Sequence, residues 1–282
     1  MLQQTRVAAV LDHYREFLKR FPTVRDLAQA READVLAAWS GLGYYRRARM
    51  LHKAAKQLVA RHKGQLPTCS SELRQLPGIG QYTGNAISSI AFGEPVAVVD
   101  GNVERVLNRM SRRESSGSDL WTLAQELLDP ASPGDFNQAM MELGATICTP
   151  TAPLCKECPV RTHCASENLL PRKRNEGEDR LRRTAHLLFR HRRNAVLLRQ
   201  RSARETLMPG MWELPELSAV SANRSLLRVR HSITKTDWTI EVFDVGEPEK
   251  GRKLQWMQVS RLGILPLTGL TRKILRKLNL LA

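Results

Sequence analysis

Apolar residues in the first part of the chain recur every three or four positions, which is the spacing of one buried face of an α-helix. This pattern predicts helices over residues 5–21, 27–39, 46–62, 120–128 and 135–143. Two shorter helical patterns are joined by the turn Leu76–Gly80, and a further helix is predicted after Asp100. The first part of the chain is therefore predicted to be mainly α.

The hydrophobic period changes in the second part of the chain. Alternating or continuous apolar runs predict strands over residues 185–189, 195–198, 238–243 and 254–259. A closing helix is predicted over residues 267–280, with a basic exposed face of Arg272, Lys273, Arg276 and Lys277. The charged, aperiodic residues 171–183 between the two parts are interpreted as a linker. The predicted domains are thus residues 1–170 and an α+β domain over residues 184–282.

The charge balance indicates the kind of partner. The chain of 282 residues carries 44 Lys and Arg against 28 Asp and Glu, a formal net charge of +16. A surplus of this size favours a polyanionic partner, with nucleic acid as the leading candidate, although a basic soluble protein is the plain alternative. No apolar run reaches the roughly 20 residues needed to cross a bilayer, so we expect a cytoplasmic protein without a membrane partner.

One stretch, residues 76–102, combines several chemical signals. Gly78 and Gly80 allow a tight turn whose backbone N–H groups can approach a phosphate closely. The apolar run 96–99 then leads to Asp100, just before a helical pattern. A carboxylate at a helix N-terminus is stabilised in its ionised form. The stretch predicts a phosphate-binding turn and a fixed anion.

A pair of tyrosines follows a glycine-rich turn at Ser40–Gly43. Tyr44 and Tyr45 can serve as a wedge or a stacking platform for bases. Tyrosine is also an ordinary core residue. The residues themselves leave both interpretations open and favour the core.

Four cysteines follow the pattern C-x6-C-x2-C-x5-C; they are Cys148, Cys155, Cys158 and Cys164. Four thiolates in so short a segment can bind tetrahedral zinc or an iron–sulfur cluster, whereas four unrelated buried cysteines are the plain alternative. Zinc ribbons usually carry two C-x2-C pairs, and a single pair therefore favours a cluster.

Several motifs together resemble the MutY family of adenine DNA glycosylases, in the helix-hairpin-helix superfamily. They are MLQQTRV at residues 1–7, WSGLGYYRRAR at 39–49, LPGIGQYTGNAI at 76–87, VDGNVERVLNR at 99–109 and the four cysteines. The resemblance covers nearly the whole chain. It implies a six-helix module, a cluster module and a cleft between them.

The resemblance also implies roles for single residues. Asp100 would stabilise or capture the positive charge that develops on the sugar, with Tyr82 and Asn102 supporting the catalytic site. Gly78 and Gly80 would hold a DNA phosphate while the target adenine is flipped out of the duplex. Two residues, Gln4 and Tyr44, would enter the base stack. The loop 148–164 would hold a [4Fe-4S] cluster on its four cysteines.

The second domain is similar to the Nudix-like domain of the same family, which recognises 8-oxoguanine. The likeness rests on residues 208–215, which read MPGMWELP, and on residues 231–235, which read HSITK. The second segment departs from the more usual Phe-Ser-His, which leaves Thr234 as the candidate lesion contact. The acidic metal-binding Nudix box is missing from the sequence, so we expect recognition without nucleotide hydrolysis.

The family implies an enzyme of base excision repair that hydrolyses the N-glycosidic bond of adenine opposite 8-oxoguanine or guanine. Its partner would be double-stranded DNA, and we expect a bacterial monomer associated with the nucleoid. Endonuclease III-like relatives use a lysine after the hairpin turn to form a Schiff base, but this position is Tyr82. A phenol cannot form an imine, which predicts a monofunctional glycosylase.

The family pattern also places a glutamate two residues before the methionine of MLQQT, as the acid that protonates the adenine. The sequence begins at Met1. A positioned general acid contributes on the order of 100- to 10,000-fold, which predicts reduced activity for this chain. A late start assignment and a truncated lesion-binding form are the two explanations, of which the first is preferred. The alternatives are therefore a catalytically impaired lesion-binding homologue and an endonuclease III-like glycosylase.

Overall fold

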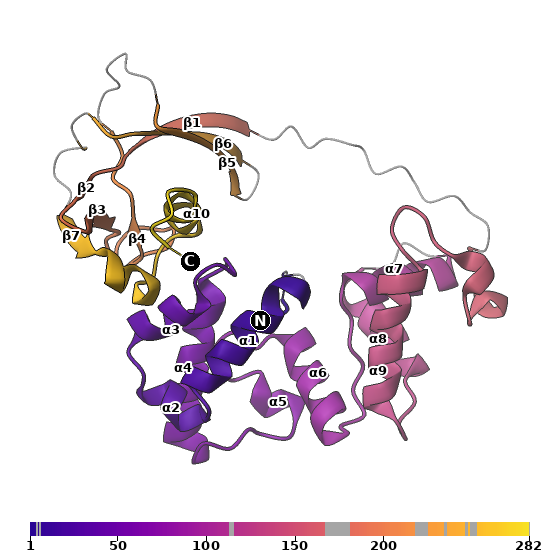
Figure 1. Cartoon of the computed structure of the whole chain (residues 1–282). Coiled ribbons are helices and arrows are strands. Elements are labelled where there is room, and N and C mark those ends of the chain that lie inside the picture. The colour runs from indigo at the N-terminus through magenta and orange to yellow at the C-terminus, as the bar shows by residue number, and fades with distance from the viewer. Residues whose placement is uncertain are drawn as a thin grey trace. The chain divides into compact units, whose positions relative to one another are not determined.

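The structure is a computed structural model, and it describes residues 1–3, 5, 7–112, 116–166, 181–217, 225–233, 236–245, 248 and 253–281 (Figure 1). The chain forms two compact units. One comprises Met1–Val59 with Gly177–Ala282, and the other comprises Ala60–Glu176. The contacts thus group the first helices with the C-terminal part of the chain. The domain boundaries predicted at residues 170 and 184 stay a prediction.

The first unit begins with four helices around one core. They are α1 Val7–Arg20, α2 Val24–Gln29, α3 Glu32–Trp39 and α4 Arg46–His62, the last of which runs past the unit boundary. The rings of Phe17 and Trp39 meet edge to face, with their centres 6.0 Å apart, in this core. A capping box at Thr23 begins α2, with Asp26 as its reciprocal partner. The first helix begins at Val7, later than the predicted start at residue 5.

The C-terminal part of this unit is α+β, as predicted. Its strands are β1 Leu181–Leu188, β2 His191–Arg192, β3 Ala195–Gln200, β4 Trp212–Glu213, β5 Leu227–Ile233, β6 Thr236–Phe243 and β7 Leu254–Gln258. One sheet has the order β1-β6-β5, with β1 parallel and β5 antiparallel to β6. The second sheet has the order β2-β3-β4, and β7 also pairs with β3. This part of the chain is thus a mixed sheet structure with one closing helix.

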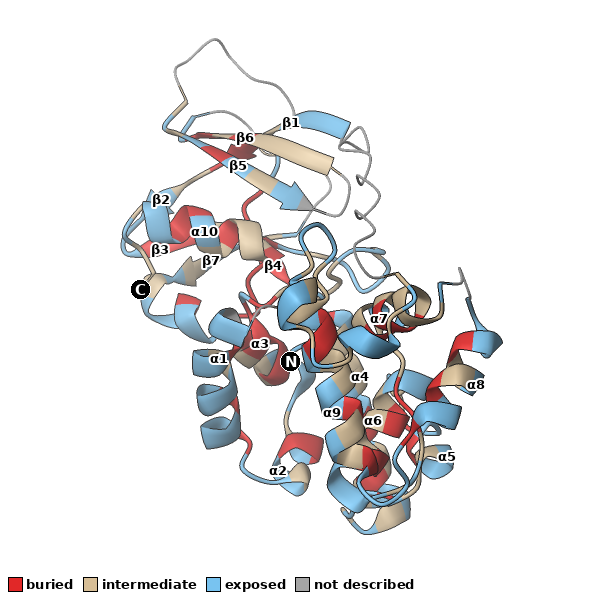
Figure 2. Ribbon diagram, turned by 90° about the vertical axis from the view of Figure 1, so that its right-hand side faces the viewer, coloured by how far each residue is buried: buried red, intermediate tan, exposed pale blue. Residues whose placement is uncertain are grey.

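The closing helix α10, Gly269–Lys277, completes the core between these elements. Ile274 and Leu275 are fully buried against sheet residues such as Val196 and Ile240, and Figure 2 shows the buried positions of α10 in red. A cap by the Thr268 hydroxyl on Thr271 N begins the helix. The helix matches the predicted position, although it is shorter than residues 267–280.

The predicted linker ends earlier than expected. Residues 171–180 lie outside the described residues, but Leu181–Arg183 pair with Thr236–Trp238 in the parallel β1/β6 ladder. Their basic side chains hid this strand from the hydrophobic pattern. The short strands β2 and β4 and the strand β5 were also not predicted.

The second unit is helical and ends in the cysteine segment. It contains α5 Ser70–Leu73, α6 Gln81–Phe92, α7 Gly101–Ser111, α8 Ser118–Leu127 and α9 Pro133–Glu142, followed by a π-helical turn, η1 Leu143–Ile147, and 3-10 turns η2 Cys155–Glu157 and η3 Arg161–His163. Val103 and Leu107 of α7 are buried against Leu120 and Ala124 of α8. The mainly α character predicted for this region is confirmed.

Candidate active site

The extended segment 94–99 leads into Asp100 and takes its backbone partners from side chains of three helices. Asn85 of α6 donates to the carbonyl of Ala97 at 2.7 Å, and Gln125 of α8 accepts from Ala97 N at 2.9 Å. Asn137 of α9 accepts from Val98 N at 3.0 Å and donates to the carbonyl of Val96 at 2.9 Å. Amide side chains here replace a strand partner, because an unpaired buried backbone group costs free energy. The segment is therefore held rigidly at the point where it reaches Asp100.

Asp100 is the N-cap of α7, as predicted. Its Oδ1 accepts from the backbone N–H groups of Asn102 and Val103, both at 2.8 Å, and its Oδ2 accepts from Asn102 Nδ2 at 3.2 Å. The carboxylate is half-buried. The helix N-terminus and three donors fix its orientation and stabilise its negative charge. An anion held in this way can stabilise a cation that develops in front of it.

Asn102 is fixed in turn by Arg105, one helical turn further on. Arg105 Nη2 donates to Asn102 Oδ1 at 2.8 Å and to the carbonyl of Gly144 at 2.6 Å, while its Nε donates to the carbonyl of Cys148 at 2.8 Å. Gly144 of η1 packs directly on Asn102, since an added Cβ would lie 2.6 Å from Asn102 Cβ. One arginine thus joins the Asp100 cap, η1 and the first cysteine.

Tyr82, in the first turn of α6, lies close enough to Asp100 for an electrostatic interaction between the two side chains. Burial raises the pKa of the Tyr82 phenol, and the negative charge of Asp100 raises this pKa further. The phenol therefore stays protonated at neutral pH, and its hydroxyl is 3.6 Å from the sulfur of Met141. Gly78, just before α6, has φ of 82°, and both Gly78 and Gly80 are exposed. The structure thus brings the turn, Tyr82, Asp100 and Asn102 together in one unit.

The four cysteines lie on the turns that follow α9. Cys148 ends η1, Cys155 begins η2, Cys158 follows it and Cys164 follows η3. Arg109 of α7 donates to Cys148 Sγ at 3.3 Å, and Cys164 Sγ donates to the carbonyl of Arg109 at 3.7 Å. All four thiols are free and half-exposed. Among the described residues, His, Cys, Asp and Glu side chains do not form a group of three or more that could hold a metal ion.

The tyrosine pair of the first unit is divided between surface and core. Tyr44 has φ of 47° and is 58% exposed, whereas Tyr45 is 5% exposed. The core interpretation is therefore wrong for Tyr44 and right for Tyr45. Gly41 and Gly43 also have positive φ, so three left-handed residues turn the backbone and point Tyr44 outward.

Arg47 connects this turn to the first residues of the chain. Its guanidinium lies 5.2 Å from the Tyr44 ring and 5.5 Å from the Trp39 ring. It also donates to the carbonyls of Met1 and Gln3, and to Thr5 Oγ1 at 2.9 Å. Gln4 itself lies outside the described residues, as does Thr234, so the structure tests neither prediction.

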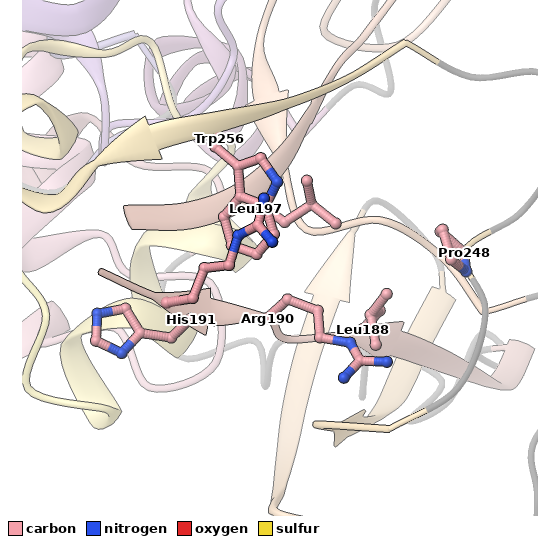
Figure 3. A pocket seen from close by; sticks show the side chains of 7 residues that line it. Leu188, Arg190, His191, Leu197, Pro248 and Trp256 are labelled. Carbon is pink, nitrogen blue, oxygen red and sulfur yellow. The ribbon is translucent and has the colours of Figure 1, made fainter. Parts of the chain in front are cut away.

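A surface pocket of about 310 Å³ lies in the C-terminal part of the first unit (Figure 3). It is lined by Leu188, Arg190, His191, Arg192, Leu197, Pro248 and Trp256. The guanidinium of Arg192 stacks 4.2 Å from the centre of the Trp256 ring. The pocket contains none of the predicted site residues. Separately, no helix among the described residues is long and apolar enough to span a membrane.

Known proteins resemble this chain in both sequence and fold. Residues 1–129 match the family model of the HhH-GPD superfamily base excision DNA repair proteins. Adenine DNA glycosylase of Homo sapiens is 51% identical over 171 residues, and that of Buchnera aphidicola subsp. Acyrthosiphon pisum is 36% identical over 173 residues. The chain is thus similar to adenine DNA glycosylases, and its first 129 residues are similar to the HhH-GPD superfamily. These alignments cover 58% and 59% of this chain.

The chain spans only 31% of the human relative and 49% of the Buchnera relative. Among solved structures, a thermostable thymine-DNA glycosylase is 28% identical, with a TM-score of 0.54 over 58% of this chain and 79% of that one. A non-covalent endonuclease III–DNA complex is 26% identical, with a TM-score of 0.53 over 58% of this chain and 78% of that one. These structures therefore resemble 58% of this chain.

The sequence prediction missed the residues that support the site. The segment before Asp100 is held by Asn85, Gln125 and Asn137. Arg105 holds Asn102, and Arg47 joins the Tyr44 turn to the first residues of the chain. Asn137 is 1% exposed and Asn85 is 9% exposed. Amide side chains on the buried faces of helices were the only available signal, because buried polar groups need partners.

Proposed function

We propose that this chain is a monofunctional adenine DNA glycosylase of base excision repair, which hydrolyses the N-glycosidic bond of adenine opposite 8-oxoguanine or guanine in duplex DNA. The observation that carries the proposal is the half-buried Asp100 carboxylate. It is held by three donors at a helix N-terminus, in a chain 51% identical to a human adenine DNA glycosylase over the shared region.

Asp100 would act on the sugar of the flipped adenosine. Two backbone N–H groups occupy Oδ1, while Oδ2 accepts only the longer bond from Asn102 Nδ2 among the bonds described for the carboxylate. Oδ2 is then the oxygen that faces the positive charge as the bond to adenine breaks. Asn102 and Arg105 prevent rotation of the carboxylate, and Gly78 and Gly80 would hold a neighbouring phosphate.

Tyr82 supports a route without β-lyase chemistry. The protonated phenol beside Asp100 can donate a hydrogen bond, but it cannot form the imine that a lysine forms with an abasic sugar. Borohydride trapping of the protein on abasic DNA is therefore expected to give no efficient covalent adduct. Efficient trapping of the unaltered protein would contradict the monofunctional assignment.

We also propose that Cys148, Cys155, Cys158 and Cys164 hold a [4Fe-4S] cluster. The chemistry of the donor set fits, because four free thiols in one short segment suit iron. A bound cluster would tie the turns after α9 to α7. Iron and acid-labile sulfide analysis of anaerobically purified protein tests this, and stoichiometric zinc without iron would contradict it.

The C-terminal α+β part is proposed as a Nudix-like recognition domain for 8-oxoguanine, with Thr234 as the candidate contact. Replacement of Thr234 by Ala is expected to reduce the preference for A:8-oxoguanine over A:G duplexes. An unchanged preference would remove Thr234 from the site.

The deciding experiment is a single-turnover assay on duplexes with A:8-oxoguanine, A:G and an oxidised pyrimidine. Adenine release supports the proposal. Selective binding of the lesion without release would instead support the lesion-binding alternative. Cleavage of the oxidised pyrimidine alone would support an endonuclease III-like enzyme.

A further inference from the structure

The turn that carries Tyr44 is held from the C-terminal part of the chain. Ser40 Oγ donates to the carbonyl of Leu267 at 2.8 Å, and the Tyr45 hydroxyl donates to the same carbonyl at 3.3 Å. Ser40 and Tyr45 are both buried and stand on either side of the three left-handed residues of the turn. Two bonds that converge on one acceptor therefore fix both ends of the Tyr44 turn.

The acceptor itself is rigid. Leu267 is fully buried and forms a parallel bridge with Trp212 of β4. Trp212 N donates to the carbonyl of Pro266 at 2.8 Å, and Thr268 N donates to the carbonyl of Trp212 at 2.9 Å. Next in sequence, Thr268 caps α10. The carbonyl that holds the turn thus belongs to the core of the C-terminal part.

Arg272 of α10 completes the connection. Its Nε donates to Ser40 Oγ at 3.0 Å, so that Ser40 can direct its own proton to the Leu267 carbonyl. Arg272 is half-buried, whereas the sequence pattern predicted an exposed residue. Burying part of a guanidinium costs free energy unless its N–H groups have partners. The Nε of Arg272 finds its partner in the hydroxyl of Ser40.

A second contact lies beside the first. Arg49 of α4 donates to the carbonyl of Pro209, and Met211 is fully buried in the core formed by α1 to α4. The C-terminal part therefore supports α3, the turn and α4 together. Tyr44 is the exposed aromatic residue at the end of this support.

We propose that Arg272 is a positioning residue for Tyr44, through Ser40 and the Leu267 carbonyl. Through this connection the C-terminal part sets the conformation in which Tyr44 meets DNA. The inference rests on the proposed function, in which Tyr44 enters the base stack. It assigns to α10 a role in stacking that is separate from any contact between the C-terminal part and the lesion.

The test is a double-mutant cycle on lesion-duplex affinity in the full chain. Arg272→Met is expected to weaken the Kd about 10-fold, the equivalent of about one hydrogen bond to a charged group. In a Tyr44→Ala background the same change is expected to alter the Kd less than about 2-fold. Lys277→Met, which removes one positive charge from the same helix, is the matched control and should leave the Kd nearly unchanged.

A direct readout of stacking accompanies the cycle. 2-Aminopurine beside the lesion is expected to brighten when wild-type protein unstacks it, and to brighten less with Arg272→Met. Ser40→Ala and Tyr45→Phe should show the same reduced signal; they remove single hydroxyls and keep the inference testable if Arg272→Met unfolds.

Two results would overturn the inference: equal losses of affinity in both backgrounds, or an unchanged 2-aminopurine signal in all three variants. Failure of the proposed function looks different, because the wild-type protein itself would then show no preference for the lesion duplex.

Discussion

Asp100 combines two roles that substitution can separate: it caps α7 and it carries the negative charge of the candidate site. Both backbone donors of the cap reach Oδ1. Asn and Asp are equally good N-caps, because either offers a side-chain oxygen to the first turn. The charge, by contrast, is lost in Asn.

We predict that Asp100→Asn lowers the single-turnover rate of adenine release by on the order of 100- to 1,000-fold, because the developing cation loses its counter-charge. Its melting temperature should stay close to that of wild type. Asp100→Ala is the comparison, since it also loses the cap and should cost about 0.5–2 kcal/mol of stability. A wild-type rate for the Asn variant would exclude Asp100 from the reaction.

His52 of α4 is a buried titratable group with a different consequence. It is 1% exposed, and its Nε2 has no partner among the described residues. Burial lowers the pKa of its imidazole below the ordinary value, and the nearby charge of Lys56 lowers it further. The folded protein therefore keeps His52 neutral.

We predict that the free energy of unfolding decreases as the pH falls below the unfolded pKa, near 6.5. Below that pH the imidazole of His52 binds a proton in the unfolded chain but not in the folded chain. The resulting loss of unfolding free energy is at most about 1.4 kcal/mol for each unit by which folding lowers the pKa. Urea titrations between pH 5 and 8 measure this. His52→Asn should flatten the profile, and a parallel profile for the two proteins would show that other groups, such as His231, are responsible.

At the scale of elements, the 94–99 segment depends on helices rather than on a sheet. Asn137 bonds to Val98 N, to the carbonyl of Val96 and to Ser89 Oγ. Replacement by Ala would leave all three groups without this partner inside the unit.

We predict that Asn137→Ala destabilises the protein by on the order of 3 kcal/mol, since each unsatisfied buried group costs about 1–3 kcal/mol. It should also slow adenine release, because the segment positions Asp100. The neighbouring Gln138 is exposed, and its side chain donates to the carbonyl of Gly134 in its own helix, so Gln138→Ala should change stability by less than about 0.5 kcal/mol. Equal effects in chemical denaturation would show that the segment does not depend on Asn137.

Two glycines near Asp100 provide a matched pair. An added Cβ on Gly144 would lie 2.6 Å from Asn102 Cβ and 2.9 Å from its carbonyl, whereas one on Gly101 would meet nothing within 4 Å. We predict that Gly144→Ala costs about 1–3 kcal/mol through overpacking and disturbs the Asn102 contacts. Gly101→Ala should keep its stability within about 1 kcal/mol. Thermal melts compare them, and equal stability would contradict the close approach of η1 and α7.

At the scale of the whole molecule, the sequence predicted those features that depend on local signals. Helical periodicity and an acid before α7 sufficed for the helices and for the Asp100 cap. Strand β5 was missed because Arg228 and Arg230 interrupt its apolar residues, and its antiparallel pairing with β6 is a contact that local patterns do not report. The bond from Ser40 to Leu267 joins residues 227 positions apart, and local patterns carry no information about such a contact.

The surplus of positive charge is a property of the whole chain, and it predicts how DNA binding responds to salt. With a net charge of +16, phosphate contacts should release many counterions. A protein with 6–10 such contacts loses about 1,000- to 100,000-fold in affinity between 50 and 200 mM salt. Fluorescence anisotropy across a KCl series is expected to show a steep linear fall of log K with log salt.

Single charges can be resolved within this slope. The exposed Lys156 lies between two of the cysteines, and if it contacts a phosphate, Lys156→Met should reduce the slope by about 1 and weaken lesion and undamaged duplexes equally. Asp100→Asn should leave the slope unchanged, because the partner proposed for Asp100 is the sugar rather than a phosphate. A flat salt response of the wild-type protein would show that contacts with bases, rather than with the backbone, dominate its binding to DNA.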